Sequence, residues 1–503
     1  MNSSSFWISS APMPEFRPLD RNLSVDVVII GGGITGITAA YLLKKAGKTV
    51  ALLERQRCAL ADTGHTTAHL TAAVDLRLSE IEKNFGGEVV KTVWDAGMAA
   101  IEQIEKLVVE EAIDCDFVRV SGTLHAPIGK NDDFAADLAV ASAHGIECSL
   151  REDVLGSGVP GLAFPNQALF HPRRYLATLV SRLEGNGSYV FEQTDAHEIS
   201  QDPVGVRVGK HVVSCRDIIV ATHTPITGLA STWGAALFQT KLSLYTSYAL
   251  SARIPAGLIV GGLYWDTGDP YSYLRVERKN GYDLAVFGGK DHKTGQADER
   301  DSLNRLCAEF SDWIPKARIE YCWSGQVVET SDGLPYLGAV DDHQFIATGF
   351  AGNGMTFGTL GGMMAAEWVA GIKSPWVDAF SPARKIHRGG TWDYLKENKD
   401  YPFLLVKDWL MRGRGETLED LHPGQGRVIS YRGKKVAAYR QPSGDVLPCS
   451  AVCTHLKCTV KWNDLERTWD CPCHGSRFRP SGEVLTGPAE EPLPSVRPVE
   501  EGP

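Results

Sequence analysis

The chain has 503 residues, a hydrophobic fraction of 43% and a formal net charge of −10 at pH 7. A chain of this length can form two or three domains with separate cores, and its ordinary apolar content excludes a disordered or fibrous protein. The acidic balance argues against nucleic acid as a partner. The start of the chain lacks the pattern of a signal peptide and no stretch is apolar enough to span a bilayer, so we expect a cytoplasmic protein without a membrane span.

The first folded unit begins after a Ser- and Pro-rich segment, residues 1–24, which we expect to form an irregular arm. The sequence D-V-V-I-I after Val25 predicts a buried parallel strand. It is followed by G-G-G-I-T-G at Gly31–Gly36, a helical run at Ile37–Ala46 and a second strand at Thr49–Leu53. This order is the βαβ fingerprint of a dinucleotide-binding domain.

Each glycine of the fingerprint has a separate task. Gly31 allows the tight turn, Gly33 lets the backbone approach a pyrophosphate, and Gly36 lets the helix pack on the strand. The helix N-terminus offers free N–H groups to phosphates, and Glu54 after the second strand is placed to accept hydrogen bonds from ribose hydroxyls. NAD and FAD would both suit this pattern.

Three later stretches favour FAD over NAD. Thr63–Ala68 follows the second strand, at the place where flavoproteins of similar build pass small and hydroxyl residues over the cofactor, and Asp217–Thr222 is a buried strand with a small-residue turn. Gly349–Thr356 follows a strand at Gln344–Thr348 and precedes a helix over residues 357–369, so a second helix N-terminus would face the ligand. The alternative is that these glycines only permit helix–sheet packing. The expected cofactor-binding residues are Gly31, Gly33, Ile34, Thr35, Gly36, Glu54, Arg55, Thr66, Thr67, Thr222, Gly352, Gly354, Met355 and Thr356.

Most cysteines lie outside any pairing pattern. Six of them are scattered along the chain and are expected to be buried small hydrophobes in a reducing compartment: Cys58, Cys115, Cys148, Cys215, Cys307 and Cys322. Residues 376–419 form a connector that we expect to pack between domains, because it is rich in aromatic residues: Trp376, Trp392, Tyr394, Tyr401, Phe403 and Trp409. Short strands are then expected at Arg427–Tyr431, Lys435–Tyr439 and Trp469–Asp470.

The C-terminal segment contains the motifs C-T-H-L-K-C and C-P-C-H-G-S-R-F. Four candidate metal ligands stand in them: Cys453, His455, Cys471 and His474. Zinc accepts such a set. A Rieske [2Fe–2S] centre is favoured, because it requires two Cys on one iron and two His on the other. A zinc ribbon has no need for the further cysteine in each motif, Cys458 and Cys473.

These motifs resemble the two boxes of Rieske proteins at nearly every position. The resemblance implies that Cys453 and Cys471 bind the inner iron, and that His455 and His474 bind the outer one. It also implies a Cys458–Cys473 disulfide between the two loops. Ser476 resembles the serine whose hydroxyl donates to a bridging sulfide, which raises the cluster potential.

Residues 20–375 resemble the superfamily of D-amino-acid oxidase, glycine oxidase and sarcosine oxidase, and in particular its bacterial fusions to a Rieske domain. T-G-H-T-T-A at Thr63–Ala68 and G-G-K-D-H-K-T-G at Gly288–Gly295 carry the resemblance to those fusions. It implies an α/β, Rossmann-like FAD domain over 25–375, with an inserted α+β substrate domain of antiparallel sheet, and an all-β Rieske domain over 420–503. The expected FAD-binding pieces are about 25–100, 150–240 and 320–375, and the substrate-domain pieces are about 100–150 and 240–320.

Alternation in the substrate-domain pieces predicts strands at Leu242–Leu250 and Tyr282–Phe287, with His292 and Lys293 in a turn after the second strand. Some relatives bind flavin covalently through a cysteine, but Gly325 stands at that position here. His69 only faintly matches the histidine that other relatives use. We therefore expect noncovalent FAD.

The substrate site is the least specified part of the sequence. Relatives commonly hold a substrate carboxylate with an Arg and a Tyr, so the resemblance makes Arg275 and Tyr273 the candidates for substrate orientation. The alternative for Arg275 is an ordinary ion pair on a surface strand.

The two predicted cofactors together suggest the function. Flavin accepts a hydride and releases electrons singly, whereas a [2Fe–2S] cluster carries one electron. We expect a dehydrogenase that oxidises a C–N bond of an amine or amino acid and reduces an external acceptor protein docking near His455 and His474. The alternatives are a reductase with the opposite electron flow and a redox sensor without enzymatic activity.

Overall fold

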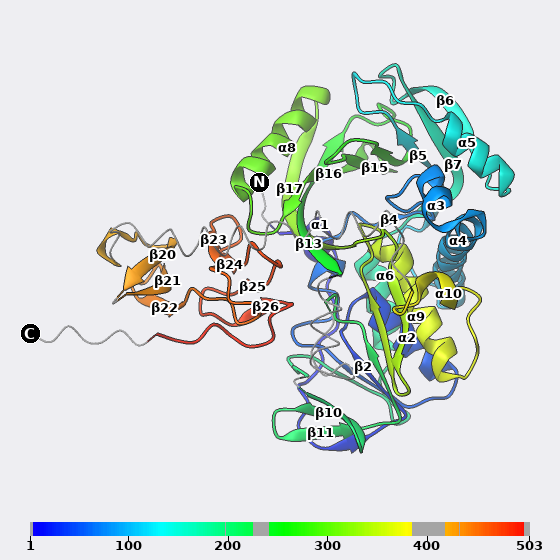
Figure 1. The fold of residues 1–503 in the computed structure, drawn as a ribbon. Coiled ribbons are helices and arrows are strands. Elements are labelled where there is room, and N and C mark those ends of the chain that lie inside the picture. Colours follow the sequence, from blue (N-terminus) through cyan, green and yellow to red (C-terminus); the bar gives the residue numbers. More distant parts are fainter. Residues whose placement is uncertain (1–3, 197, 225–240, 385–417, 432, 497–503) are drawn as a thin grey trace, which may run out of the picture.

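The computed structural model describes residues 4–196, 198–224, 241–384, 418–431 and 433–496. Three sheets build the part before residue 385, and two smaller sheets build the C-terminal domain. The C-terminal domain lies against one side of the larger part, where the six-stranded and nine-stranded sheets meet (Figure 1).

The six-stranded sheet has the order β18-β19-β12-β2-β3-β8. Five strands run parallel and β18 runs antiparallel to β19. The strands are β2 (Val27–Ile30), β3 (Val50–Leu53), β8 (Tyr189–Phe191), β12 (Asp217–Val220), β18 (Tyr336–Asp341) and β19 (Gln344–Thr348). The predicted strands at residues 49–53 and 344–348 are confirmed in position within one residue.

Both faces of this sheet are covered, which explains why the central strands β2 and β3 are apolar and buried at every position. Val27 and Ile29 pack with the helices on one face, whereas Val28 and Ile30 pack with a four-stranded sheet on the other. That sheet has the order β1-β11-β10-β9 and consists of β1 (Leu23–Ser24), β9 (Glu198–Gln201), β10 (Val204–Val208) and β11 (His211–Ser214).

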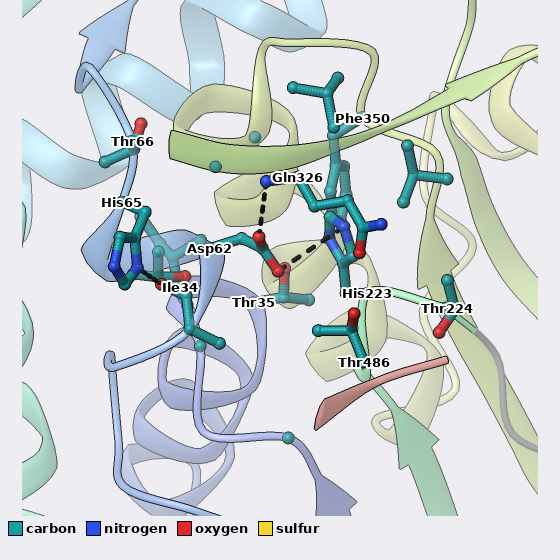
Figure 2. A pocket seen from close by; sticks show the side chains of 18 of the residues that line it. Ile34, Thr35, Asp62, His65, Thr66, His223, Thr224, Gln326, Phe350 and Thr486 are labelled. Carbon is teal, nitrogen blue, oxygen red and sulfur yellow. Dashed lines mark hydrogen bonds and ion pairs between the residues drawn. The ribbon is translucent and has the colours of Figure 1, made fainter. Parts of the chain in front are cut away.

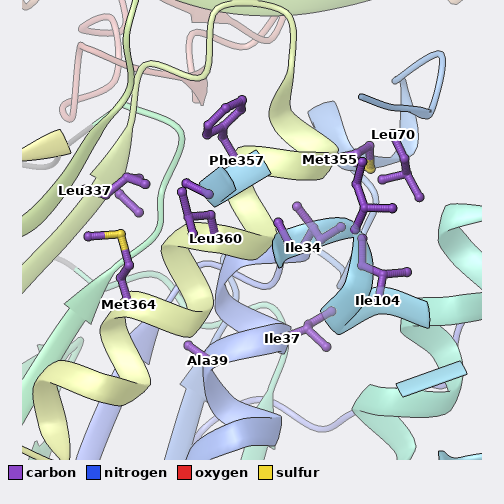
Figure 3. Packing of buried hydrophobic residues seen from close by; sticks show 14 of the residues in the cluster. Ile34, Ile37, Ala39, Leu70, Ile104, Leu337, Met355, Phe357, Leu360 and Met364 are labelled. Atoms are coloured by element: carbon purple, nitrogen blue, oxygen red, sulfur yellow. The ribbon is translucent and has the colours of Figure 1, made fainter. Parts of the chain in front are cut away.

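Two helices that begin at the predicted glycine-rich turns pack tightly against each other. They are α2 (Ile34–Lys45) and α9 (Gly354–Val369), and they lie side by side with α4 (Gly87–Glu110) in the core (Figure 3). A Cβ on Gly362 of α9 would lie 2.8 Å from Thr38 Cβ and 2.9 Å from the Thr35 carbonyl oxygen. Glycines on α9 therefore let its axis approach α2.

The nine-stranded sheet covers the carboxyl ends of the parallel strands (Figure 1). Its path is β17-β13-β16-β15-β14-β5-β7-β4, with β6 paired to β7. The strands are β4 (His69–Leu70), β5 (Val118–His125), β6 (Ser149–Val154), β7 (Val159–Leu169), β13 (Leu242–Ile254), β14 (Gly262–Asp266), β15 (Tyr273–Arg278), β16 (Asp283–Lys293) and β17 (Arg318–Thr330). Helix α8 (Glu299–Trp313) packs on it.

Three expectations about this region need correction. The sheet continues beyond the expected substrate-domain pieces, through β7 (Val159–Leu169) and most of β17 (Arg318–Thr330), into the pieces at about 150–240 and 320–375 that were assigned to FAD binding. His292 and Lys293 lie in β16 and not in a turn, because β13 continues to pair with them. The N-terminal arm is not irregular: α1 (Phe6–Ser10) buries Trp7, whose indole N–H donates to the Thr66 carbonyl at 2.6 Å.

The C-terminal domain consists of two antiparallel sheets, as expected for a small β domain. The first contains β20 (Gly426–Tyr431), β21 (Lys434–Arg440) and β22 (Val446–Ser450). The second contains β23 (Lys461–Asn463), β24 (Thr468–Asp470), β25 (Arg477–Phe478) and β26 (Val484–Thr486). Of the predicted aromatic connector, Trp392, Tyr394, Tyr401, Phe403 and Trp409 lie outside the described residues. Among the helices that the structure describes, none has the length and apolar character needed to cross a membrane.

The close packing of α2 on α9 makes a stability prediction. Gly362→Ala gains helix propensity of up to about 1 kcal/mol, but the new Cβ meets a backbone carbonyl and a β-carbon that cannot move freely. We expect a net destabilisation of about 1–3 kcal/mol, measured as a lower urea midpoint. Gly261→Ala is the control, because the nearest atoms to its Cβ lie at 3.6 Å and 3.7 Å. An unchanged midpoint for Gly362→Ala would contradict this packing.

Candidate functional site

A cavity of about 300 Å³ lies between the six-stranded sheet, the nine-stranded sheet and the C-terminal domain. One end is formed by the loop from Gly31 to Ile34 at the carboxyl end of β2. The other end is formed by side chains of the nine-stranded sheet, including Tyr273 and Asp291. Figure 2 shows how Asp62, His223 and Gln326 face one another in the middle of this cavity.

The turn of the glycine-rich loop leaves no space for a side chain at Gly31 or Gly36. Gly31 has a φ of +108°, and a Cβ there would lie 2.3 Å from the Ala221 carbonyl oxygen. A Cβ on Gly36 would lie 1.9 Å from the Gly31 carbonyl oxygen. The loop thereby brings backbone N–H groups and the α2 N-terminus to the cavity, where a pyrophosphate would be stabilised.

Glu54 is fixed at the end of β3, inside the cavity lining. Its carboxylate accepts hydrogen bonds from the N–H groups of Gly32 and Gln56, both at 2.7 Å. Burial raises the pKa of Glu54, and these two N–H groups oppose that rise. The carboxylate is therefore held in place as an acceptor beside the glycine-rich loop.

Most of the predicted cofactor-binding residues come together around this cavity. Those that line it are Gly31, Gly33, Ile34, Thr35, Glu54, Arg55, Thr66, Thr67, Thr222, Gly352, Gly354 and Met355. Gly36 and Thr356 lie outside the lining. Gly36 packs against the Gly31 turn, and Thr356 is buried with its Oγ1 accepting from the Thr71 N–H at 3.2 Å.

Several cavity residues were not predicted from the sequence. The Thr63 hydroxyl accepts from the Ile34 N–H at 3.2 Å, and Asp62 accepts from the Gln326 N–H at 3.1 Å. His223 Nε2 lies 3.6 Å from the Asp62 carboxylate. Asp62 directly precedes the T-G-H-T-T-A motif and Thr63 is its first residue, so the motif could have indicated both as cavity residues. Gln326 lies within a long strand, and nothing in its sequence context marks it.

The two candidates for substrate orientation have different surroundings. The Tyr273 side chain lines the cavity, and its hydroxyl lies 2.6 Å from Ser247 Oγ. Arg275 is fully buried outside the cavity lining, where it pairs with Glu277 at 2.9 Å and donates to the Ala68 carbonyl at 2.8 Å. Its guanidinium also lies over the Trp7 ring. Because these contacts already engage Arg275, its predicted role as a carboxylate clamp does not fit the structure.

Two carboxyl groups line the same end of the cavity as Tyr273. Burial, with a smaller contribution from the charge of Asp291, raises the pKa of Asp75 to about 7. Burial raises the pKa of Asp291 to about 6, and a hydrogen bond from Ser247 opposes the rise. Neither residue was predicted, although Asp291 lies inside the G-G-K-D-H-K-T-G motif.

The cavity residues fit a flavin dinucleotide. The loop at one end has the glycines and N–H groups that a pyrophosphate needs, and Glu54 stands beside it. Thr486, from the C-terminal domain, reaches the cavity (Figure 2), and its Oγ1 is buried without a hydrogen-bond partner among the described residues. Gly325 stands in the lining where a covalent link would need a cysteine, and Cys322 packs in a separate apolar cluster.

The second candidate centre lies in two adjacent loops of the C-terminal domain. The Cys453 and Cys471 side chains are buried there, and the imidazole centroids of His455 and His474 are 5.1 Å apart. Cys458 and Cys473 form a disulfide that joins the two loops. These residues were all assigned from the sequence.

The pKa values of these side chains suit a [2Fe–2S] cluster that is bound by both Cys and His. A hydrogen bond from Cys471 lowers the pKa of Cys453 to about 7, helped by the N–H groups of His455 and Leu456. Burial lowers the pKa of His455 and of His474 to about 4, so both imidazoles are neutral at pH 7 and able to bind metal. Two buried cysteines and two neutral imidazoles are the donor types that a Rieske [2Fe–2S] cluster requires.

The two centres share a wall. Residues 485–490 of the C-terminal domain line the cavity, and Arg55 donates to the Leu485 carbonyl at 2.7 Å. Gln326 Nε2 donates to the Gly475 carbonyl at 2.8 Å, next to His474. The Ala489 N–H, in the same wall, donates to Ser476 Oγ at 2.9 Å. The Ser476 hydroxyl is in turn one of the groups that lower the pKa of Cys453.

Comparison with known proteins agrees with both centres. Residues 26–368 match the family described as FAD dependent oxidoreductase, and residues 415–497 match the Rieske [2Fe-2S] domain. The chain is 34% identical over 510 residues to a Rieske 2Fe-2S iron-sulfur protein, YhfW, of Bacillus subtilis (strain 168), covering 98% of this chain and 97% of that protein.

Two more distant relatives each cover about three quarters of the chain. Gamma-glutamylputrescine oxidoreductase of Escherichia coli (strain K12) is 24% identical over 388 residues, covering 74% of this chain and 89% of that protein. The structure of glycine oxidase from Geobacillus kaustophilus superposes with a TM-score of 0.58 at 19% identity, covering 73% of this chain and 100% of that chain. The protein belongs to the FAD-dependent oxidoreductase family and carries, at its C-terminal end, a Rieske domain for a [2Fe–2S] cluster.

Proposed function

We propose that this oxidoreductase removes a hydride from the carbon of a C–N bond in a small amine or amino acid and delivers the electrons singly, through the Rieske cluster, to an external acceptor. The observation that carries the proposal is the shared wall: residues 485–490 line the cavity and are bonded to the cluster loop. FAD, when bound, supplies the two-electron acceptor, and the [2Fe–2S] cluster supplies a one-electron outlet.

The chain's own residues would hold the two centres in fixed relation. Gln326 belongs to the cavity lining and also donates to the Gly475 carbonyl of the cluster loop. A Cβ on Gly475 would lie 2.5 Å from Leu244 Cβ, so the loop is pressed against β13 without space for water. Burial of this contact supports electron transfer within one chain instead of transfer between separate proteins.

An external partner would bind on the side of the cluster that faces away from the cavity. His474 lies next to the carbonyl held by Gln326, and Lys293 of the nine-stranded sheet contributes to its lowered pKa. His455 is followed by Leu456, which together with Val452 forms an exposed apolar spot with 36% of each residue accessible. An electron-transfer protein docking at this spot would contact the cluster through His455.

The direction of flow and the enzymatic role are separate parts of the proposal. A redox sensor would need no reaction space, whereas this cavity contains ionisable groups such as Asp75 and Asp291 at the substrate end. Reverse flow, from an external donor through the cluster to the flavin, uses the same contacts. It would be revealed by turnover with a reduced ferredoxin and by the absence of flavin bleaching with any amine.

Loss of the cluster should slow electron transfer from the flavin to an external acceptor protein. In Cys453→Ser protein we expect normal photoreduction of FAD but at least about tenfold slower reduction of added cytochrome c, because the large acceptor reaches only the cluster. The measurement is anaerobic photoreduction followed by stopped-flow mixing with cytochrome c. Cys449→Ser is the matched control, since Cys449 is buried in the same domain and is not a ligand. Equal rates in Cys453→Ser and wild type would show that electrons leave the flavin directly.

Removal of the Gln326 amide should slow transfer between the centres. Gln326→Leu keeps the side-chain size but loses a hydrogen bond worth about 1 kcal/mol, which corresponds to a rate about fivefold lower. The measurement is the delay between flavin reduction and appearance of the reduced cluster in rapid-freeze EPR.

The control for this variant is Gln296→Leu. Gln296 also bonds the C-terminal domain, donating to the Pro472 carbonyl at 2.8 Å, but it does not line the cavity. If both variants slow transfer equally, docking of the domain and not the Gln326 contact sets the rate.

A further inference from the structure

The substrate end of the cavity contains two carboxyl groups, Asp75 and Asp291. We infer that it binds the alkylammonium group of an amine that has no carboxylate beside its nitrogen, and that Asp75 and Asp291 are the residues that hold this cation. The inference rests on the proposed function and narrows its substrate from amines and amino acids to amines.

The two carboxylates lie among residues from different elements that meet at one place. Asp291 comes from β16 and Ser247 from β13, whereas Asp75 follows β4. The Tyr271 hydroxyl lies 3.4 Å from an Asp75 oxygen and donates to it. A Cβ on Gly352 would lie 2.8 Å from the Tyr271 hydroxyl and 3.2 Å from Asp75, so the glycine leaves room for both side chains.

No cationic side chain compensates these carboxylates within the described residues that line the cavity. Its two arginines are engaged near the nucleotide end: Arg55 by the Leu485 carbonyl and Arg57 by Glu192 at 2.6 Å. Burial, with help from the charge of Arg275, lowers the pKa of His69 to about 3, so this imidazole is neutral at pH 7. Arg275 itself is paired with Glu277 outside the lining.

Asp291 supplies an independent indication of a missing partner. Its Oδ1 is buried and has no hydrogen-bond partner among the described residues. A buried carboxylate oxygen without a donor is costly, and an ammonium N–H would remove that cost with a charge-assisted hydrogen bond. A substrate carboxylate at the same place would meet two negative charges and no cation.

The walls around the carboxylates also favour a cation. Aromatic rings of Trp265, Tyr271, Tyr273 and Phe350 belong to the lining. The rings of Tyr271 and Tyr273 are 5.6 Å apart at an angle of 50°, and the Tyr273 ring meets His69 edge-on at 5.9 Å. Electron-rich ring faces attract an ammonium group and bury the alkyl chain next to it.

The raised pKa values give the site a defined pH dependence. Asp75 faces Tyr271 and Asp291, and Asp291 faces Ser247 and Tyr273, so no other group in this set takes a charge between pH 5 and 9. The two carboxyls are ionised above about pH 7 and become protonated as the pH falls through about 7 and 6. Affinity for a cation should therefore be full at pH 8 and be lost progressively toward pH 5.

The test uses two probes that differ only in the α-carboxylate, butylamine and 2-aminopentanoate. Each is titrated anaerobically into the holoenzyme at pH 8, and binding is measured by the change in the absorption spectrum of oxidised FAD and by calorimetry. We expect a Kd at least tenfold lower for butylamine than for either enantiomer of 2-aminopentanoate. The Kd for butylamine should rise at least tenfold in Asp75→Asn and in Asp291→Asn, and at pH 5.5 in the wild type.

Asp312→Asn, an exposed substitution on α8, is the control and should bind butylamine like the wild type. Tighter binding of the amino acid, no binding of either probe, or unchanged affinity in both Asp→Asn variants would overturn the inference. The cytochrome c experiment starts from photoreduced protein without any amine. If that experiment succeeds while butylamine fails to bind, the inference about the substrate falls and the proposed electron path remains.

Discussion

The contact between the cluster loop and β17 joins the cavity to the C-terminal domain. Gln326 holds the Gly475 carbonyl, and the neighbouring segment 485–490 closes the cavity beside it. The Arg55 bond to Leu485 reinforces the same junction from the nucleotide-binding side. Without this junction the chain would consist of two independent redox modules, and the cavity would be open on one side.

The buried positive charge of Arg275 lies outside the cavity lining. Arg275 and Glu277 neutralise each other under Trp7 of the N-terminal helix, and breaking such a buried pair by removing one partner costs about 3–5 kcal/mol. The arginine therefore packs with the arm, and among the described residues of the lining Asp75 and Asp291 are the carboxyl groups near Tyr273. The N-terminal helix thus packs over Arg275 and also contacts the cavity lining, because the Trp7 indole N–H donates to the Thr66 carbonyl.

Much of this architecture could be predicted from the sequence because it depends on local motifs. The glycine spacing at Gly31–Gly36 and the ligand spacing at Cys453–His455 and Cys471–His474 each reflect contacts within a few residues. The structure brings Gly31 and Gly33 to the cavity at the N-terminus of α2, and the two predicted helices agree with α2 and α9, whereas the strand expected at 282–287 continues to Lys293 as β16.

The remaining features depend on tertiary contacts that no local pattern records. Tyr273 and Arg275 are two residues apart on one strand, so their side chains lie on the same face. Tyr273 nevertheless reaches the cavity, whereas Arg275 is covered by the N-terminal arm. Gln326 is one polar residue in a long strand, and its importance arises only from docking of the distant domain. The assignment of residues 159–169 failed for a similar reason, because a strand that joins a distant sheet carries no mark of its partner.

The central claim is that flavin and cluster exchange electrons within one chain, and an anaerobic reductive titration followed by absorbance and low-temperature EPR tests it most directly. The account predicts that about three electrons per chain are taken up, two by FAD and one by the cluster, with the Rieske signal reaching equilibrium with the flavin within the mixing time. It would be contradicted if the flavin were fully reduced while the cluster, reducible by dithionite, stayed oxidised.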